Sequence, residues 1–199
     1  MKNRSKNNND LLEAARDGQT DEVRRLIPIS DPKYGDSVAL YWAAANGHAE
    51  CVQLLIPVSD ANSDEGAPLF KSAHGGYIKC VQLLLPATDP TYYYRALDFA
   101  AMEGHRDCVE ILMSVVNTDE RSNALRIASR YSRHDIVDVL FEVSDVDTAL
   151  DILMGQYPNT PQYWQYLKDK VEAFHAQQQN QVLRKEIAHS GTGMAQRKM

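Results

Sequence analysis

The chain has 199 residues, 44% of them hydrophobic, which is enough for a buried core and excludes disorder throughout. Its formal net charge of -6 argues against a general nucleic-acid or anionic-membrane binder, because no long basic stripe balances the acidic residues. No apolar run is long enough to span a bilayer, and residues 1–10 do not read as a secretory signal. We therefore expect an intracellular, cytoplasmic protein whose partners are proteins, with no nucleic acid and no membrane.

Residues 1–9 are charged and rich in asparagine, and we expect them to be a disordered N-terminus. Residues 10–147 then repeat one pattern, seen most clearly in Leu40, Ala43, Ala44 and Gly47. The i, i+3, i+4 spacing predicts an amphipathic helix, and a valine and a leucine three residues apart mark a second helix after the glycine. The leucines that open the five copies are Leu11, Leu40, Leu69, Leu97 and Leu125.

The unit resembles the ankyrin repeat, which reads roughly Thr-Pro-Leu-His-x-Ala-Ala, then Gly-His, then Val-x-x-Leu-Leu. Gly47-His48 and Gly104-His105 match its inter-helix turn, whereas Ser132-Arg133 has lost both residues. Glycine at this turn favours a left-handed conformation, so Ser132 is expected to mark a strained or altered turn. Successive leucines are 28 or 29 residues apart, against about 33 in the family. We therefore expect tight turns in place of β-hairpin fingers between repeats.

The loops between repeats contain a second regularity, a proline followed by Ser/Thr-Asp. Pro28, Pro57 and Pro86 predict the end of each second helix. The Ser/Thr and Asp side chains are expected to accept hydrogen bonds from backbone N–H groups of the turn. Cysteines recur at the repeat spacing, which predicts small, buried, unpaired thiols in a reducing compartment. They are Cys51, Cys80 and Cys108.

The register ends after residue 147. Residues 148–183 are interpreted as a degenerate sixth repeat and a helix whose apolar stripe caps the open end of the stack. That stripe consists of Trp164, Leu167, Val171 and Phe174. A coiled-coil dimer through this helix is the alternative, disfavoured because the stripe ends within two heptads. Residues 184–199 are expected to be a disordered basic tail.

No catalytic constellation is present in the sequence. His48 and His105 lie at turns, the cysteines lack metal-ligand spacing, and Gly75-Gly76 lacks the other residues of a phosphate loop. We predict no catalytic residues, no cofactor and no metal, and therefore no enzyme.

The resemblance implies where a partner binds. In ankyrin arrays the two residues before each turn glycine and the loop residues just before each unit line the concave face. Tyrosine, methionine and arginine at such positions are typical of binding hot spots. Trp42, Phe99 and Ile127 are expected to be core, and Lys71 is an anomaly at their position. The predicted partner-binding residues are Tyr34, Asn46, Asp64, His74, Tyr92, Tyr94, Met102, Glu103, Arg130 and Tyr131.

The sequence therefore predicts an all-α, ankyrin-like helical solenoid with a C-terminal capping helix. The expected function is non-enzymatic binding of one partner protein through the concave face, as an effector or inhibitor that blocks or sequesters it. Such a chain resembles standalone bacterial or viral ankyrin effectors, which implies action in the cytoplasm of a host cell. The alternative is an oligomeric adaptor that dimerises through the C-terminal helix and recruits an enzyme. We expect a monomer, with that dimer as the competing state.

Overall fold

The computed structural model describes residues 2–143 and, beyond them, residues 165, 169, 172–173, 176–177, 179–180 and 182–184. The chain divides into two compact units, Met1–Leu153 and Met154–Met199. In the second unit the described positions are all helical and exposed. The predicted sixth repeat and the apolar stripe of the predicted capping helix lie outside the described residues.

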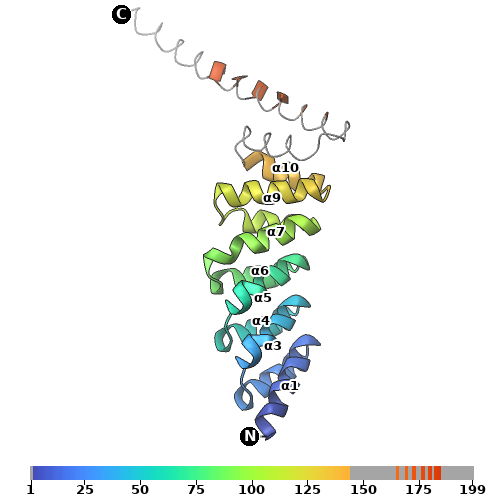
Figure 1. Ribbon diagram of the computed structural model, residues 1–199, viewed down its shortest axis with the longest axis vertical. Helices are drawn as coiled ribbons and strands as arrows, with labels where there is room; N and C mark the ends of the chain where they lie inside the picture. The colour runs from blue at the N-terminus through green and yellow to red at the C-terminus, as the bar shows by residue number, and fades with distance from the viewer. Residues whose placement is uncertain are drawn as a thin grey trace, which may run out of the picture. The chain divides into compact units, whose positions relative to one another are not determined.

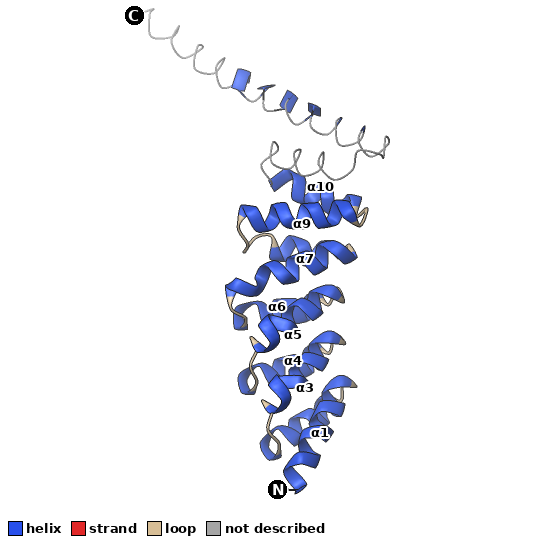
Figure 2. Ribbon diagram, in the orientation of Figure 1, coloured by secondary structure: helices blue, strands red, loops and turns tan. Residues whose placement is uncertain are grey.

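Residues 2–143 form α-helices and short 3-10 helices, and this range contains no strand (Figure 2). The helices form five successive pairs, each pair being one repeat. The pairs are α1 Lys2–Arg16 with α2 Thr20–Leu26, α3 Tyr34–Ala45 with α4 Ala49–Leu55, α5 Ser63–His74 with α6 Ile78–Leu84, α7 Tyr93–Glu103 with α8 Arg106–Leu112, and α9 Thr118–Arg130 with α10 His134–Val143. The 3-10 helices are η1 Ile27–Ile29, η2 Ile56–Val58, η3 Leu85–Ala87 and η4 Pro90–Tyr92.

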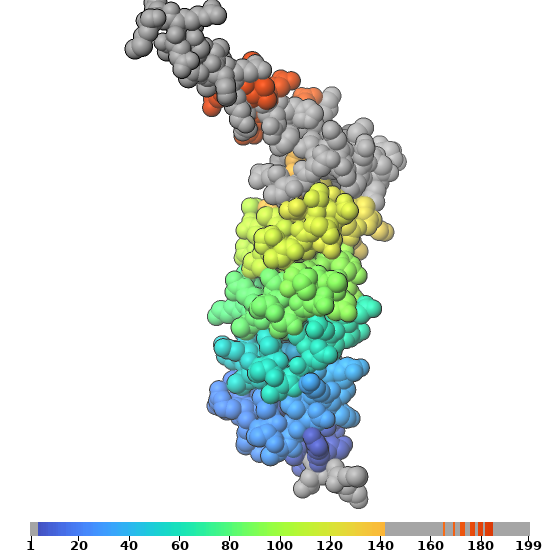
Figure 3. Space-filling model, turned by 90° about the vertical axis from the view of Figure 1, so that its left-hand side faces the viewer, coloured from blue at the N-terminus to red at the C-terminus, as the bar shows by residue number. Residues whose placement is uncertain are grey.

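The pairs stack into two rows (Figure 1). The odd-numbered helices α1, α3, α5, α7 and α9 contact one another in chain order, and the even-numbered helices do the same in the second row. The repeats consequently follow one another along the stack in sequence order (Figure 3). The leucines that open the repeats and the small residues three and four positions later are buried between the rows. This confirms the predicted register of the core.

The three cysteines lie in this core, on α4, α6 and α8. All three are buried and free, as the sequence predicted. Burial raises the pKa of the Cys80 and Cys108 thiols to about 11. They therefore act as small apolar side chains rather than as nucleophiles.

The turns inside each repeat have the predicted left-handed geometry. Gly18, Gly47, Gly76 and Gly104 have φ between 70° and 86°. Ser132 holds the equivalent position with φ 56°, which confirms a strained turn in the fifth repeat. A Cβ at Gly18 would also lie 2.5 Å from Nδ1 of His48, so glycine is required there by space as well as by φ.

The loops between repeats are tight, as expected, and the second helices of the first three repeats end two residues before a proline. The carboxylates behave as predicted: Oδ1 of Asp89 accepts a hydrogen bond from the N–H of Thr91 at 2.9 Å. The prediction for the hydroxyls was wrong. Ser30 and Thr88 donate to the carbonyls of Leu26 and Leu84, four residues back, because these helix-end carbonyls lack an intrahelical partner.

The first helix corrects another prediction. Residues 2–9, expected to be disordered, form the first turns of α1. Oδ1 of Asn8 accepts a hydrogen bond from the N–H of Asp31 at 2.8 Å, and Asn7 donates to the carbonyl of Ile29 at 2.9 Å. The asparagines therefore connect α1 to the end of η1 and to the loop after it, which accounts for helix in a segment of unfavourable composition.

Candidate partner-binding surface

One side of each odd-numbered helix faces away from the even-numbered row. We call the exposed and half-exposed side chains on this side of α3, α5, α7 and α9 the odd-helix face. The residue two positions after each core leucine lies on it, because two residues turn an α-helix by about 200°. Trp42 is 37% exposed there, and Phe99 and Ile127 are half-buried. None of the three belongs to the buried core, so that prediction was wrong, and Lys71 is no anomaly at a position that is at least partly exposed in every repeat.

A groove of about 430 Å³ runs along this face between α7 and α9. Four predicted partner-binding residues line it: Tyr94, Met102, Arg130 and Tyr131. Tyr94 and Tyr131 are 41% and 50% exposed. The remaining lining residues are Arg95, Asp98, Phe99, Arg126 and Ile127. The structure therefore brings these four of the predicted partner-binding residues together at one groove.

An aromatic cluster lies beside the groove, on the side of α5. The rings of Phe70 and Phe99 stack with their centroids 5.2 Å apart, and the ring of His74 meets Phe99 edge-on at 5.6 Å. The guanidinium of Arg95 lies 4.4 Å from the centroid of Phe70, in cation-π contact. This arrangement holds Arg95 and Phe99 in place at the edge of the groove.

Asp98 is the acidic group of the groove. Its Oδ2 accepts a hydrogen bond from Nδ2 of Asn123 at 2.8 Å, and its buried Oδ1 has no hydrogen-bond partner among the described residues. Burial raises the pKa of Asp98 to about 6, against the opposing effects of the Asn123 hydrogen bond and of the Arg126 charge. The carboxyl group is thus less acidic than an ordinary aspartate.

His74 and Glu103 were predicted as partner-binding residues and lie close to each other. His74 is exposed, and its Nε2 lies 3.6 Å from Oε1 of Glu103. The other carboxylate oxygen of Glu103 lies 3.9 Å from Nη2 of Arg133. Glu103 therefore connects three successive repeats, and a partner would have to compete with these contacts to use it.

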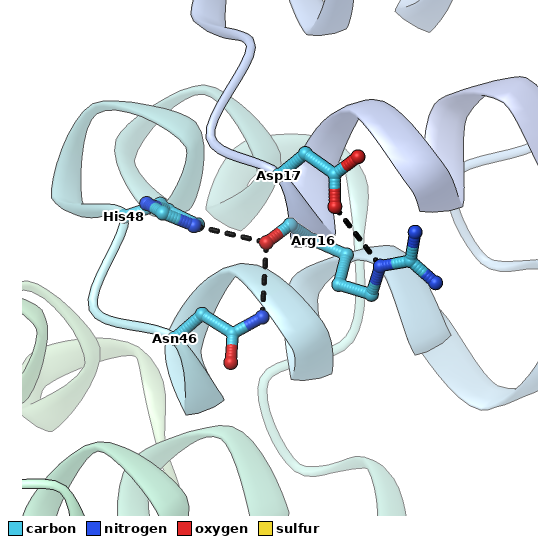
Figure 4. Close-up of polar contacts among 4 residues, drawn as sticks. All are labelled: Arg16, Asp17, Asn46 and His48. Carbon is cyan, nitrogen blue, oxygen red and sulfur yellow. Dashed lines mark hydrogen bonds and ion pairs between the residues drawn. The ribbon is translucent and has the colours of Figure 1, made fainter.

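Asn46 and His48 bind the preceding repeat. Nδ2 of Asn46 and Nε2 of His48 both lie 2.9 Å from the carbonyl oxygen of Arg16, while the side chain of Arg16 turns toward Asp17 (Figure 4). Nε2 of His105 meets the carbonyl of His74 in the same way, and Nε of Arg133 meets that of Met102. We call these contacts the carbonyl ladder. Asn46 is exposed, but its amide already has a structural role.

Apart from Tyr94, the loop residues predicted for the site are distributed more widely. Tyr34 is 47% exposed at the start of α3. Asp64 shares a second groove, between α3 and α5, with Tyr41 and Trp42. Tyr92 is half-buried. A Cβ added at Gly66 would lie 2.9 Å from the Cβ of Tyr92, so Tyr92 packs against the preceding repeat. The structure does not bring Tyr34, Asp64 and Tyr92 to the groove between α7 and α9.

Sequence reasoning missed Arg95, Asp98 and Arg126 as groove residues. A signal existed: Asp98 and Arg126 stand one position after a core leucine, where the second and third repeats have Tyr41 and Phe70. Within the described ranges, no group of three His, Cys, Asp or Glu side chains is placed to hold a metal ion. Over the same residues, no helix is both long and apolar enough to cross a membrane.

Stacked helix pairs joined by glycine turns define a helical-repeat solenoid, and comparisons with known proteins specify its kind. Residues 11–94 match a family model described as ankyrin repeats, in three copies, so this segment consists of ankyrin repeats. Among solved structures, the chain is similar to the human ASB11 ankyrin repeat domain, with 24% sequence identity and a TM-score of 0.62. The likeness covers 76% of this chain and 85% of that chain, and it shows the same fold. No curated protein matches the sequence.

Proposed function

We propose that this protein captures one partner protein on the odd-helix face and thereby blocks or sequesters it, without catalysing a reaction. Ankyrin repeats are generally protein-protein interaction modules, typically non-enzymatic ones. The observation that carries the finer proposal is the groove between α7 and α9, with Tyr94 and Tyr131 exposed beside it. Large amphipathic side chains around a concavity supply contact area at low entropic cost, which is typical of binding hot spots.

The proposal includes action inside a cell, with the cytoplasm of a host cell as the favoured place. The free thiols of Cys51, Cys80 and Cys108 support it, because thiols persist in reducing compartments. The adaptor alternative, dimerisation through the C-terminal helix, stays a prediction, since the apolar stripe of that helix lies outside the described residues.

The test is affinity capture from a host-cell lysate with the wild type and a Tyr94→Ala, Tyr131→Ala double variant. We expect the double variant to lose the proteins that the wild type retains, with an almost unchanged thermal midpoint, because both side chains are exposed. The matched control is Gln53→Ala with Gln82→Ala, which truncates two exposed side chains on α4 and α6. This control should retain every partner.

Three outcomes would contradict the proposal. If the tyrosine variant captured the same proteins as the wild type, binding would not depend on the odd-helix face. If the glutamine control lost the partner instead, the even-numbered row would be the binding surface. Turnover of a captured protein by the purified chain would contradict the non-enzymatic part.

A further inference from the structure

The groove between α7 and α9 is basic, although the whole chain has a formal net charge of -6. Three arginines line it, Arg95, Arg126 and Arg130, against the single carboxylate of Asp98. Phe99, Met102 and Ile127 provide its apolar part. The lining of the groove is therefore positively charged, although the chain as a whole is acidic.

The three arginines differ in the contacts that they already make. Nη1 of Arg95 lies 2.6 Å from Oε2 of Glu65, so its charge is partly compensated. Arg126 donates a hydrogen bond to the side-chain oxygen of Asn123. Arg130 is exposed and makes no hydrogen bond or ion pair within residues 2–143. The groove therefore presents one guanidinium with all five of its N–H donors available.

We infer that the groove between α7 and α9 receives a partner segment in which a carboxylate lies beside an aromatic or long aliphatic side chain. The carboxylate pairs with Arg130, which offers the planar fork that binds a carboxylate in bidentate fashion. The apolar side chain covers Phe99, Met102 and Ile127, where it removes nonpolar surface from water. This inference rests on the proposed function and names the chemistry of the partner.

Charge complementarity favours this occupant over the two other candidates. Residues 184–199 of the chain itself contain four Lys or Arg and one Glu, so their net charge has the same sign as that of Arg130. A nucleic acid would contact the arginines through phosphates, but a chain of net charge -6 opposes a polyanion outside the groove. A short acidic segment avoids most of this repulsion, because it meets only the groove.

The inference is tested by selecting binders from a phage-displayed library of random twelve-residue peptides on the immobilised full-length protein. We expect the selected peptides to be enriched in Asp or Glu next to Phe, Tyr, Trp or Leu. Synthetic copies are then measured by fluorescence anisotropy against the wild type, Arg130→Gln and Lys79→Gln. Lys79 is the matched control, because it is an exposed cation on α6. Arg130→Gln should weaken binding about tenfold, as for a hydrogen bond to a charged group, and Lys79→Gln should not.

Other results would overturn the inference or assign the groove to another occupant. Peptides without acidic enrichment, equal binding to an Asn/Gln version of a selected peptide, or no Arg130-dependent peptide at all would overturn the inference. Wild-type dimers that Arg130→Gln converts to monomers in light scattering would assign the groove to a second copy. Competition by a peptide of residues 184–199 would assign it to the chain's own tail. In each case the proposed function is tested separately, by comparing lysate capture by the wild type and by the Tyr94→Ala, Tyr131→Ala double variant.

Discussion

Ser132 offers a direct test of how the turn geometry contributes to stability. It closes the turn between α9 and α10 with φ 56°, where the four preceding repeats have glycine. A residue with a Cβ is destabilised by about 1–2 kcal/mol in the left-handed region. A new glycine stabilises the unfolded chain by about 0.4–1 kcal/mol, because it increases its conformational entropy. The difference predicts that Ser132→Gly raises the free energy of unfolding by about 0.5–1 kcal/mol.

Urea unfolding followed by far-UV circular dichroism measures this change as a higher midpoint with an unchanged m-value. The matched control is the reverse substitution, Gly104→Ser. Gly104 has φ 86°, and an added Cβ would lie 3.1 Å from Cδ of Arg133. By the same difference this variant should lose about 0.5–1 kcal/mol, and more if that close contact does not relax. A Ser132→Gly variant that unfolds at the same urea concentration as the wild type, or a lower one, would refute the argument from φ.

Three further predictions concern single side chains. The pKa of Asp98 is about 6 in the folded protein, above its ordinary value of 3.8. Folding therefore favours the protonated carboxyl group. The stability that this group contributes is fully present below pH 3.8 and is lost as the pH rises through about 6. At pH 8 the free energy of unfolding of Asp98→Asn should therefore exceed that of the wild type by about 1 kcal/mol, after discounting for solvent screening. At pH 3.5 the two should be equal. Urea titration at both pH values measures the difference. Asn117 and Glu120 form a capping box at the start of α9, so Asn117→Ala should cost about 1 kcal/mol in a thermal melt. Since burial raises the pKa of Cys108 to about 11, iodoacetamide at pH 8 should modify it only in denaturant; rapid labelling of the folded protein would contradict this.

The core of the solenoid was predictable because periodicity reports burial directly. Leu40, Ala43 and Ala44 are all fully buried, as their i, i+3, i+4 spacing requires. The same geometry would have placed Trp42 outside, since it lies between these positions along the chain and on the other side of the helix. The error came from carrying over a semi-buried position from the family rather than from the periodicity itself.

The N-terminal part of α1 was not predictable in the same way. Its composition favours disorder, and its helix is supported by Asn7 and Asn8, whose partners lie 22 and 23 residues away in the chain. No local pattern identifies such partners.

The candidate site was predicted in part, and the division has a physical reason. Tyr94, Met102, Arg130 and Tyr131 were found because the repeats differ where the core imposes no constraint. The groove itself depends on side chains of α7 and α9 that become neighbours only when two repeats stack. The positive charge of the groove was missed for that reason, because it comes from arginines of two neighbouring repeats.

The carbonyl ladder explains why the variable positions can vary. Arg16, His74 and Met102 each stand two residues before a turn glycine, and a side chain of the next repeat binds each of their carbonyl oxygens. The ladder thus constrains the backbone at these positions and leaves the side chain free to differ; in Figure 4 the carbonyl of Arg16 is bound by Asn46 and His48, while its side chain contacts Asp17. At these three of the four junctions between repeats, the contact uses an atom that every residue type possesses. Substitution at these positions can therefore change what the surface binds without removing this hydrogen bond between repeats.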